Sequence, residues 1–211
     1  MKKLLIIAAS VALFGVTASA QVINSVELGY SPVTLNSNAT IIGLNSSESE
    51  NLNAISASWS QARAILDSTP LYVQYGAGVQ YAWNVEKTDL VKTSKDFLTI
   101  KVPVNVLFDL AIPSTPVHLM PFAGVNVQGY LLGQQSMTGG KTTTKVDLFE
   151  EYEDMNRVVL GWQAGAKVAF QNFFVGVSYE GPITNLLHTT GSNSEIKMNT
   201  HQVNISLGIS F

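Results

Sequence analysis

The segment Leu71–Trp83, LYVQYGAGVQYAW, decides the fold because its residues alternate between two unlike faces. Every second residue, starting with Leu71, is aliphatic or aromatic, while the residues between them are mostly glutamine, glycine or alanine. A period of two residues is typical of a β-strand that has one apolar face.

The same alternation recurs along the chain. It is as regular in three further segments and weaker in the others, above all in the first two strands. We therefore predict eight strands, at Val22–Tyr30, Leu52–Leu66, Leu71–Trp83, Leu98–Leu110, Val117–Leu132, Val158–Phe170, Phe173–Glu180 and Val203–Phe211.

The connections between these strands alternate between short and long. Tight turns are expected at 67–70, 113–116 and 171–172, and long polar loops at 31–51, 84–96, 134–156 and 185–195. With both termini on the side of the tight turns, this layout predicts an all-β fold, an eight-stranded antiparallel up-and-down transmembrane β-barrel of the outer membrane.

A soluble fold with the apolar face inside is the alternative. An eight-stranded barrel has room for one modest set of interior side chains, so the bulky apolar faces of all strands cannot fit within it. Glycines such as Gly76, Gly78, Gly161 and Gly165 lie on the polar face and suit a crowded lumen. Volume alone leaves a soluble β-sandwich open.

Composition and the N-terminal segment narrow the class of protein. The chain has 211 residues, 13% of them charged, a net charge of −3 and no cysteine. These values argue against a nucleic-acid partner and exclude disulfides, thiol nucleophiles and cysteine-ligated zinc. Residues 1–20 have the charged, apolar and A-x-A regions of a secretory signal peptide, and their apolar run is short for a membrane anchor. The barrel domain is then residues 21–211.

Four segments carry a family resemblance: FLTIKVPVNVLF (97–108), MPFAGVNVQGYLL (120–132), GWQAGA (161–166) and YEGPITNL (179–186). They resemble the outer-membrane β-barrel domain family common in Bacteroidetes, which includes PorT-like proteins, although Val102 stands where isoleucine is usual. The resemblance covers about residues 71–211 and implies an outer-membrane location without a general activity. It also implies that Phe211 acts as the insertion signal read by the barrel-assembly machinery.

Five charged residues are expected to face the lumen: Glu27, Lys101, Asp109, Lys167 and Glu180. Buried charges must be paired and hydrogen-bonded, so a structural network of salt bridges is the main interpretation. A proton or ion path is the alternative, which the narrow lumen of an eight-stranded barrel disfavours.

The histidines and the acidic run give no catalytic or metal site. His118, His188 and His201 lack metal-ligand spacing, and neither His188 nor His201 has the serine two positions later that a barrel-type lipid deacylase would need. Residues 150–154 are expected to be a solvated acidic loop, or else a site for cation bridging to lipopolysaccharide or to a partner surface. We expect no catalytic residue, metal or cofactor.

Pro103 and Pro121 conflict with continuous strands because proline cannot donate to a β-ladder. We expect a bulge or a locally unpaired stretch at each.

The sequence thus predicts a non-catalytic outer-membrane barrel that displays loops for surface interaction or envelope structure. Its expected partners are outer-membrane lipid, lipopolysaccharide, the barrel-assembly machinery and a protein bound through loops 31–51 and 134–156. An accessory subunit of a secretion machine is the first alternative, and a lipid-modifying enzyme is the second.

Overall fold

The computed structural model describes residues 22–41, 44–66, 69–87, 91–139, 142–151, 154–191 and 194–211. The predicted signal peptide, residues 1–20, lies outside these described residues. The elements are β1 (Val22–Ile41), β2 (Leu44–Ala64), β3 (Leu71–Lys87), β4 (Val91–Phe108), β5 (Leu110–Ala111), β6 (Val117–Gly139), β7 (Thr142–Asp147), α2 (Leu148–Glu151), β8 (Val158–Phe170), β9 (Phe173–Pro182), β10 (Leu187–Gly191) and β11 (Ser194–Ser210).

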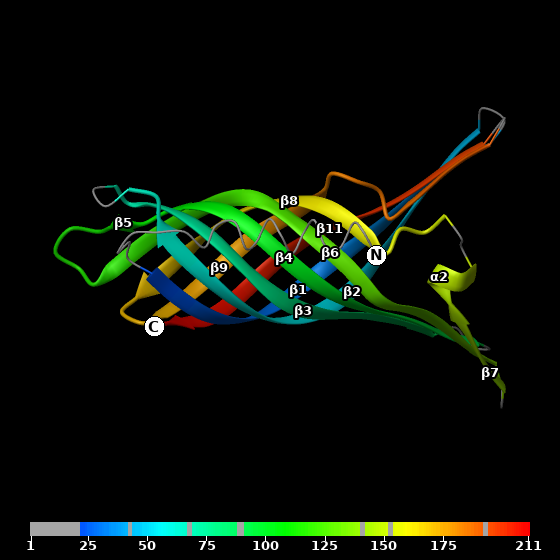
Figure 1. Cartoon of the computed structure of the whole chain (residues 1–211). Helices are drawn as coiled ribbons and strands as arrows, with labels where there is room; N and C mark the ends of the chain where they lie inside the picture. The colour runs from blue at the N-terminus through cyan, green and yellow to red at the C-terminus, as the bar shows by residue number, and fades with distance from the viewer. Residues whose placement is uncertain are drawn as a thin grey trace.

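Eight long strands form a closed antiparallel ring in the order β1-β2-β3-β4-β6-β8-β9-β11, and β1 pairs with β11 to complete it. The predicted up-and-down barrel is therefore confirmed, and Figure 1 shows its strongly tilted strands. Three short strands are additions to this ring: β5 and β7 pair with β6, and β10 pairs with β11. The tight turns and Phe211 lie at one end of the barrel, here called the tight-turn end. The opposite end, where several strands extend beyond the ring as the arms described below, is called the arm end.

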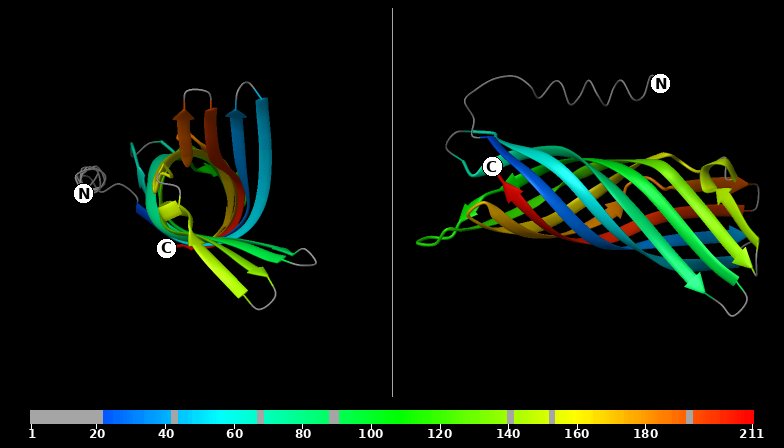
Figure 2. Two further views of the ribbon diagram at one scale, coloured as in Figure 1. Left: turned by 90° about the vertical axis from the view of Figure 1, so that its right-hand side faces the viewer. Right: turned by 90° about the horizontal axis from the view of Figure 1, so that it is seen from below.

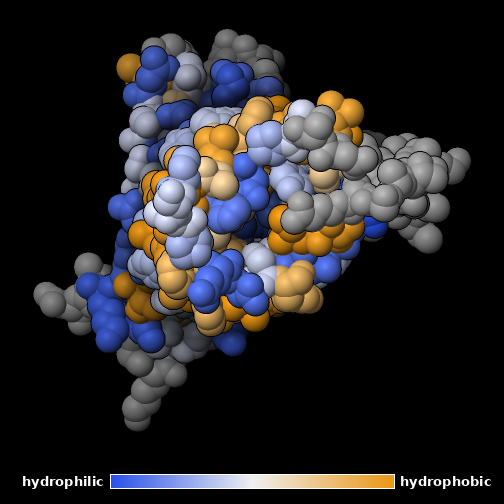
Figure 3. Space-filling model, turned by 90° about the vertical axis from the view of Figure 1, so that its left-hand side faces the viewer, coloured by the Kyte–Doolittle hydropathy of each residue, from blue (hydrophilic) through white to orange (hydrophobic). Residues whose placement is uncertain are grey.

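The barrel is apolar outside and polar inside, as the alternation predicts. Leu28, Val175 and Leu207 are 63%, 53% and 64% exposed, whereas Gln74 and Asn126 on the opposite faces are 5% and 1% exposed. Figure 3 views the tight-turn end and shows hydrophilic residues in the hollow, surrounded by hydrophobic residues on the rim. Among the residues that the structure describes, no helix has the length and apolarity needed to cross a membrane.

Three prolines interrupt the ladder without changing its register. β3 and β4 pair at Tyr75↔Val104 and again at Gly78↔Lys101, so Pro103 has no partner on β3, although it pairs with Asn126 of β6 on its other side. Similar gaps occur at the other two prolines. Pro121 of β6 has no partner where β4 ends, and Pro32 of β1 has no partner on β11. The prediction for Pro103 and Pro121 is confirmed in its second form, a local loss of pairing on the side where the missing N–H would have donated.

The prediction of long polar loops was wrong, because most of residues 31–51, 84–96, 134–156 and 185–195 continue the β-strands. β2, β1, β11 and β10 extend together as a four-stranded sheet, here called arm A, built from 44–51, 33–41, 194–201 and 187–191. β3, β4, β6 and β7 extend as arm B, built from 84–87, 91–96, 133–139 and 142–147. Figure 2 shows the two arms diverging from the barrel mouth.

Candidate functional site

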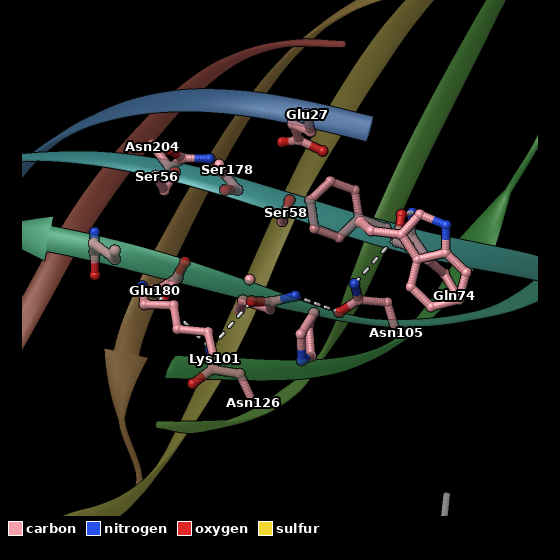
Figure 4. A pocket seen from close by; sticks show the side chains of 18 of the residues that line it. Glu27, Ser56, Ser58, Gln74, Lys101, Asn105, Asn126, Ser178, Glu180 and Asn204 are labelled. Atoms are coloured by element: carbon pink, nitrogen blue, oxygen red, sulfur yellow. Dashed lines mark hydrogen bonds and ion pairs between the residues drawn. The ribbon is translucent and has the colours of Figure 1, made fainter. Parts of the chain in front are cut away.

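Two ion pairs cross the middle of the lumen. Lys101 Nζ on β4 lies 2.8 Å from Glu180 Oε2 on β9, and Lys167 Nζ on β8 lies 2.6 Å from Glu27 Oε2 on β1. Each pair joins strands that lie three positions apart in the eight-stranded ring, so each one spans the lumen. Figure 4 shows Lys101 and Glu180 pointing toward one another within the cavity.

Asp109 lies apart from these four charges. It follows β4 at the tight-turn end, where its Oδ1 is 2.6 Å from Nδ1 of His118 on β6. The structure therefore brings together four of the five predicted lumen charges and places the fifth with a histidine that the sequence reasoning had treated separately.

Carboxamide side chains extend the Lys101–Glu180 pair into a hydrogen-bonded network whose members were not predicted from the sequence. Gln163 Nε2 donates to Asn105 Oδ1 at 2.7 Å, and Asn105 Nδ2 donates to Gln74 Oε1 at 3.2 Å. Asn126 Nδ2 donates both to Gln163 Oε1 at 3.1 Å and to Glu180 Oε2 at 3.4 Å. The alternation of the strands indicates that these carboxamides face inward. It does not indicate which of them meet, because they come from four different strands whose relative register the sequence does not give.

Aromatic rings and a small cavity complete the middle of the lumen. The Lys167 ammonium lies 4.5 Å from the centroid of Phe174 and 5.8 Å from that of Phe122, a cation–π arrangement that offsets part of its loss of water. The cavity between the charges and amides has a volume of about 90 Å³. That volume is well below the roughly 300 Å³ at which ligand pockets usually begin, so this part of the lumen suits hydration of polar groups better than an organic ligand.

An apolar cluster fills the lumen at the arm end. Leu148 and Phe149 of α2 pack with Phe97, Tyr130 and Leu186, and all five are buried. The ring centroids of Phe97 and Tyr130 are 6.0 Å apart, and those of Tyr130 and Phe149 are 5.9 Å apart. This cluster was not predicted, because 134–156 was expected to be a long polar loop, although Leu148 and Phe149 are apolar residues within that polar stretch.

The remaining histidines lie on arm A and at its base. His201 Nδ1 is 2.7 Å from the Tyr179 phenol, and His188 Nε2 is 3.2 Å from Glu195 Oε1. Hydrogen bonds from Lys197 and then from His188 hold the pKa of the Glu195 carboxyl below its usual value. Within the described ranges, no three potential His, Cys, Asp or Glu ligands gather as a metal site.

The acidic run and Phe211 have simple surroundings. Glu150 and Glu151 are exposed on α2, and Asp154 Oδ2 accepts a hydrogen bond from Thr189 at 2.8 Å; residues 152 and 153 lie outside the described ranges. Phe211 is 67% exposed, and its backbone exchanges hydrogen bonds of 2.9 and 3.0 Å with Asn24 on β1. Its role as an insertion signal stays a prediction.

No protein-family model and no curated protein matches the chain, so the resemblance to the Bacteroidetes family stays a prediction. Solved structures similar to this chain include the following three. Ail, the attachment invasion locus protein of Yersinia pestis, is 15% identical over 90% of this chain and 98% of its own, with a TM-score of 0.40. Neisserial surface protein A is 12% identical over 89% and 97%, with a TM-score of 0.41. The outer membrane enzyme PagL is 17% identical over 82% and 97%, with a TM-score of 0.35.

Proposed function

We propose that this chain is an integral barrel of the bacterial outer membrane and that arms A and B carry non-catalytic interactions at the cell surface. The observation that carries the proposal is the apolar outer surface of all eight ring strands. Large aliphatic and aromatic side chains on that surface are commonly 40–65% exposed, as at Leu160, Val177 and Ile205 (42%, 53% and 54%). A continuous apolar surface of this extent is unsuited to water and suited to lipid.

Aromatic side chains mark both edges of this apolar belt. Such residues favour membrane interfaces because one part of the ring system is apolar while its edge tolerates water. The tight-turn end carries Phe108, Phe170 and Phe173, and the arm end carries Tyr81, Trp162 and Tyr179. The arms therefore begin where the proposed membrane ends.

The lumen is better suited to support than to transport or binding. Its central charges are paired, its carboxamides are hydrogen-bonded to one another, and the apolar cluster around Phe149 fills its arm end. The arms, in contrast, present polar surface. Thr34, Asn36, Asn38 and Thr40 on the outer face of arm A each hydrogen-bond a side chain of β2.

The absence of cysteine allows a direct test of this arrangement. Ser47→Cys in arm A should react with a membrane-impermeant maleimide on intact cells, whereas Thr115→Cys in a tight turn should react only after the outer membrane is broken. Equal labelling of both variants on intact cells, or the reverse pattern, would contradict the proposed orientation.

A crosslinking experiment tests the role of the arms. A photoreactive amino acid at position 47 should crosslink to protein on intact cells, while the same group at Val175, on the lipid-facing side of β9, should give no protein adduct. Protein adducts from position 175 alone would place the interaction on the barrel wall and refute the proposal. The identity of an adduct at position 47 separates a surface partner from the alternative, a secretion machine.

A further inference from the structure

The ring has a fork at its arm end, where β2 and β3 separate. Their ladder runs from Ala64↔Tyr72 to Asn53↔Trp83 and stops there, although β2 continues outward to Leu44 and β3 continues to Lys87. Within the described residues, the outer part of β2 pairs only with β1, and the outer part of β3 pairs only with β4. Two strand edges with free backbone donors and acceptors therefore face the same opening.

A crevice of about 450 Å³ lies at this fork, within the usual size range of ligand pockets. Leu35 and Met198 of arm A contribute apolar surface to it, and Glu48, Glu50, Glu86 and Lys95 contribute charge. The crevice thus combines a partly apolar wall with free strand edges, which are the two features that a bound extended segment uses.

The charges of the crevice select the kind of segment. Lys95 forms an ion pair with Glu50, and Asn84 Nδ2 donates to Glu50 Oε1 at 3.0 Å, so Glu50 is already engaged where arm A meets arm B. Glu48 has no ion-pair partner among the described residues, and Glu86 receives only an amide hydrogen bond, from Asn84 at 3.4 Å. The crevice therefore has a net charge of −2, which attracts cations and repels anionic headgroups.

We propose that this crevice binds an extended, basic segment of a partner protein, which adds as a strand to the free edge of β2. Side chains of an added strand alternate between the two faces of the sheet. One set reaches the inner face with Glu48 and Glu86, and the other lies on the outer face beside Ser47 and Ser49, which are uncharged and already hydrogen-bonded to β1. The segment should therefore carry lysine or arginine at every second position with small polar residues between them. This inference rests on the proposed function of the arms and names the chemistry of their partner.

Fluorescence anisotropy with a labelled octapeptide of alternating lysine and threonine tests the proposal, using the full barrel in lipid nanodiscs at low ionic strength. The peptide should bind saturably, and Glu48→Gln with Glu86→Gln should weaken binding by about tenfold. Glu150→Gln with Glu151→Gln, the same charge change on α2, is the matched control and should bind as wild type. Heat-dependent gel mobility checks that each variant is a folded barrel.

A second peptide separates strand addition from simple charge attraction. N-methylation of alternate backbone amides removes ladder donors and keeps every charge, so this peptide should bind at least about tenfold more weakly. The proposal would be overturned if the methylated peptide bound as tightly as the unmethylated one, or if the Glu48/Glu86 variant bound as tightly as the Glu150/Glu151 control. It would also be overturned if wild type showed no saturable binding. Crosslinking from position 47 on intact cells would still succeed in those cases if the broader function of the arms holds.

Discussion

Replacing Lys101 with methionine should destabilise the barrel strongly because it leaves the Glu180 carboxylate inside the lumen without its cation. Lys101 and Glu180 side chains are only 13% and 10% exposed, and their charged atoms are 2.8 Å apart. The other donors to this carboxylate, Asn126 and Gln128, are both at 3.4 Å and cannot replace a full charge. Breaking a buried ion pair on one side costs about 3–5 kcal/mol.

A double variant that removes both charges of this pair is the comparison for Lys101→Met. Lys101→Met with Glu180→Gln replaces the carboxylate by an amide oxygen that Asn126 and Gln128 can still reach. Because removing both partners avoids an isolated buried charge, this variant should lie within about 1 kcal/mol of wild type. Lys197→Met is the control on arm A, since it breaks a 2.8 Å pair with Glu195 whose side chains are both 41% exposed.

Urea titration of the refolded barrel in phospholipid vesicles measures these differences. Tryptophan fluorescence is the reporter, since Trp59 and Trp162 lie on the outer surface at 44% and 42% exposure. Lys101→Met should lower the free energy of unfolding by about 3–5 kcal/mol, and Lys197→Met should leave it unchanged. An unfolding midpoint of Lys101→Met equal to that of wild type, or a double variant no more stable than the single one, would refute the buried-pair reasoning.

Three further predictions follow from the facing and packing of the strands. Leu207→Arg should reduce the amount of folded barrel in the outer-membrane fraction, because an arginine on the lipid-facing surface near the middle of a bilayer costs about 2–4 kcal/mol. Leu44→Arg at the end of arm A should accumulate normally, and equal amounts of the two variants would refute the assignment of Leu207 to the lipid-facing surface. Gly165→Ala should destabilise the barrel by about 1–3 kcal/mol, because its Cβ would lie 2.3 Å from the Val177 carbonyl oxygen, whereas Gly129→Ala meets nothing closer than 4.0 Å and should be neutral in urea titration. Planar-bilayer recordings should show no stable large openings, and such openings would mean that the lumen is not filled as described.

The ring strands could be predicted from the sequence because lipid on one side and a crowded lumen on the other impose unlike residues at alternate positions. That contrast weakens beyond the membrane, where the outer face of a strand meets water instead of lipid. The outer parts of β1 (36–41) and β2 (44–51) are therefore rich in asparagine, serine and threonine and have the composition of a loop. Their backbone ladder is supplemented by cross-strand side-chain hydrogen bonds such as Ser47 to Asn38, which no periodicity of apolar residues reveals.

The lumen charges were predictable as inward-facing residues but their partners were not. Parity assigns Lys101, Lys167, Glu27 and Glu180 to one face, yet pairing depends on the stagger between strands that lie far apart in the ring. Asp109 shows the consequence. It has the parity of the lumen, but it follows the last residue of β4, Phe108, and so reaches His118 at the tight-turn end instead of the central charges.

The arms differ from flexible loops in the cost of binding. Fixing the backbone of a flexible residue costs about 1–2 kcal/mol, which a loop must recover from its contacts with a partner. In arm A this cost is already met on folding, because the β1–β2 ladder continues to Ile41↔Leu44 and side-chain bonds at 2.7 Å (Asn36 with Ser49) and 2.8 Å (Asn38 with Ser47) reinforce it. A strand that adds to the free edge of β2 meets an ordered template, so only the partner's own segment has to be ordered. The β1–β2 ladder therefore orders arm A and leaves the other edge of β2, the free edge, available to a partner. For this reason we place recognition on the backbone of β2, and the selectivity for a basic segment on Glu48 and Glu86.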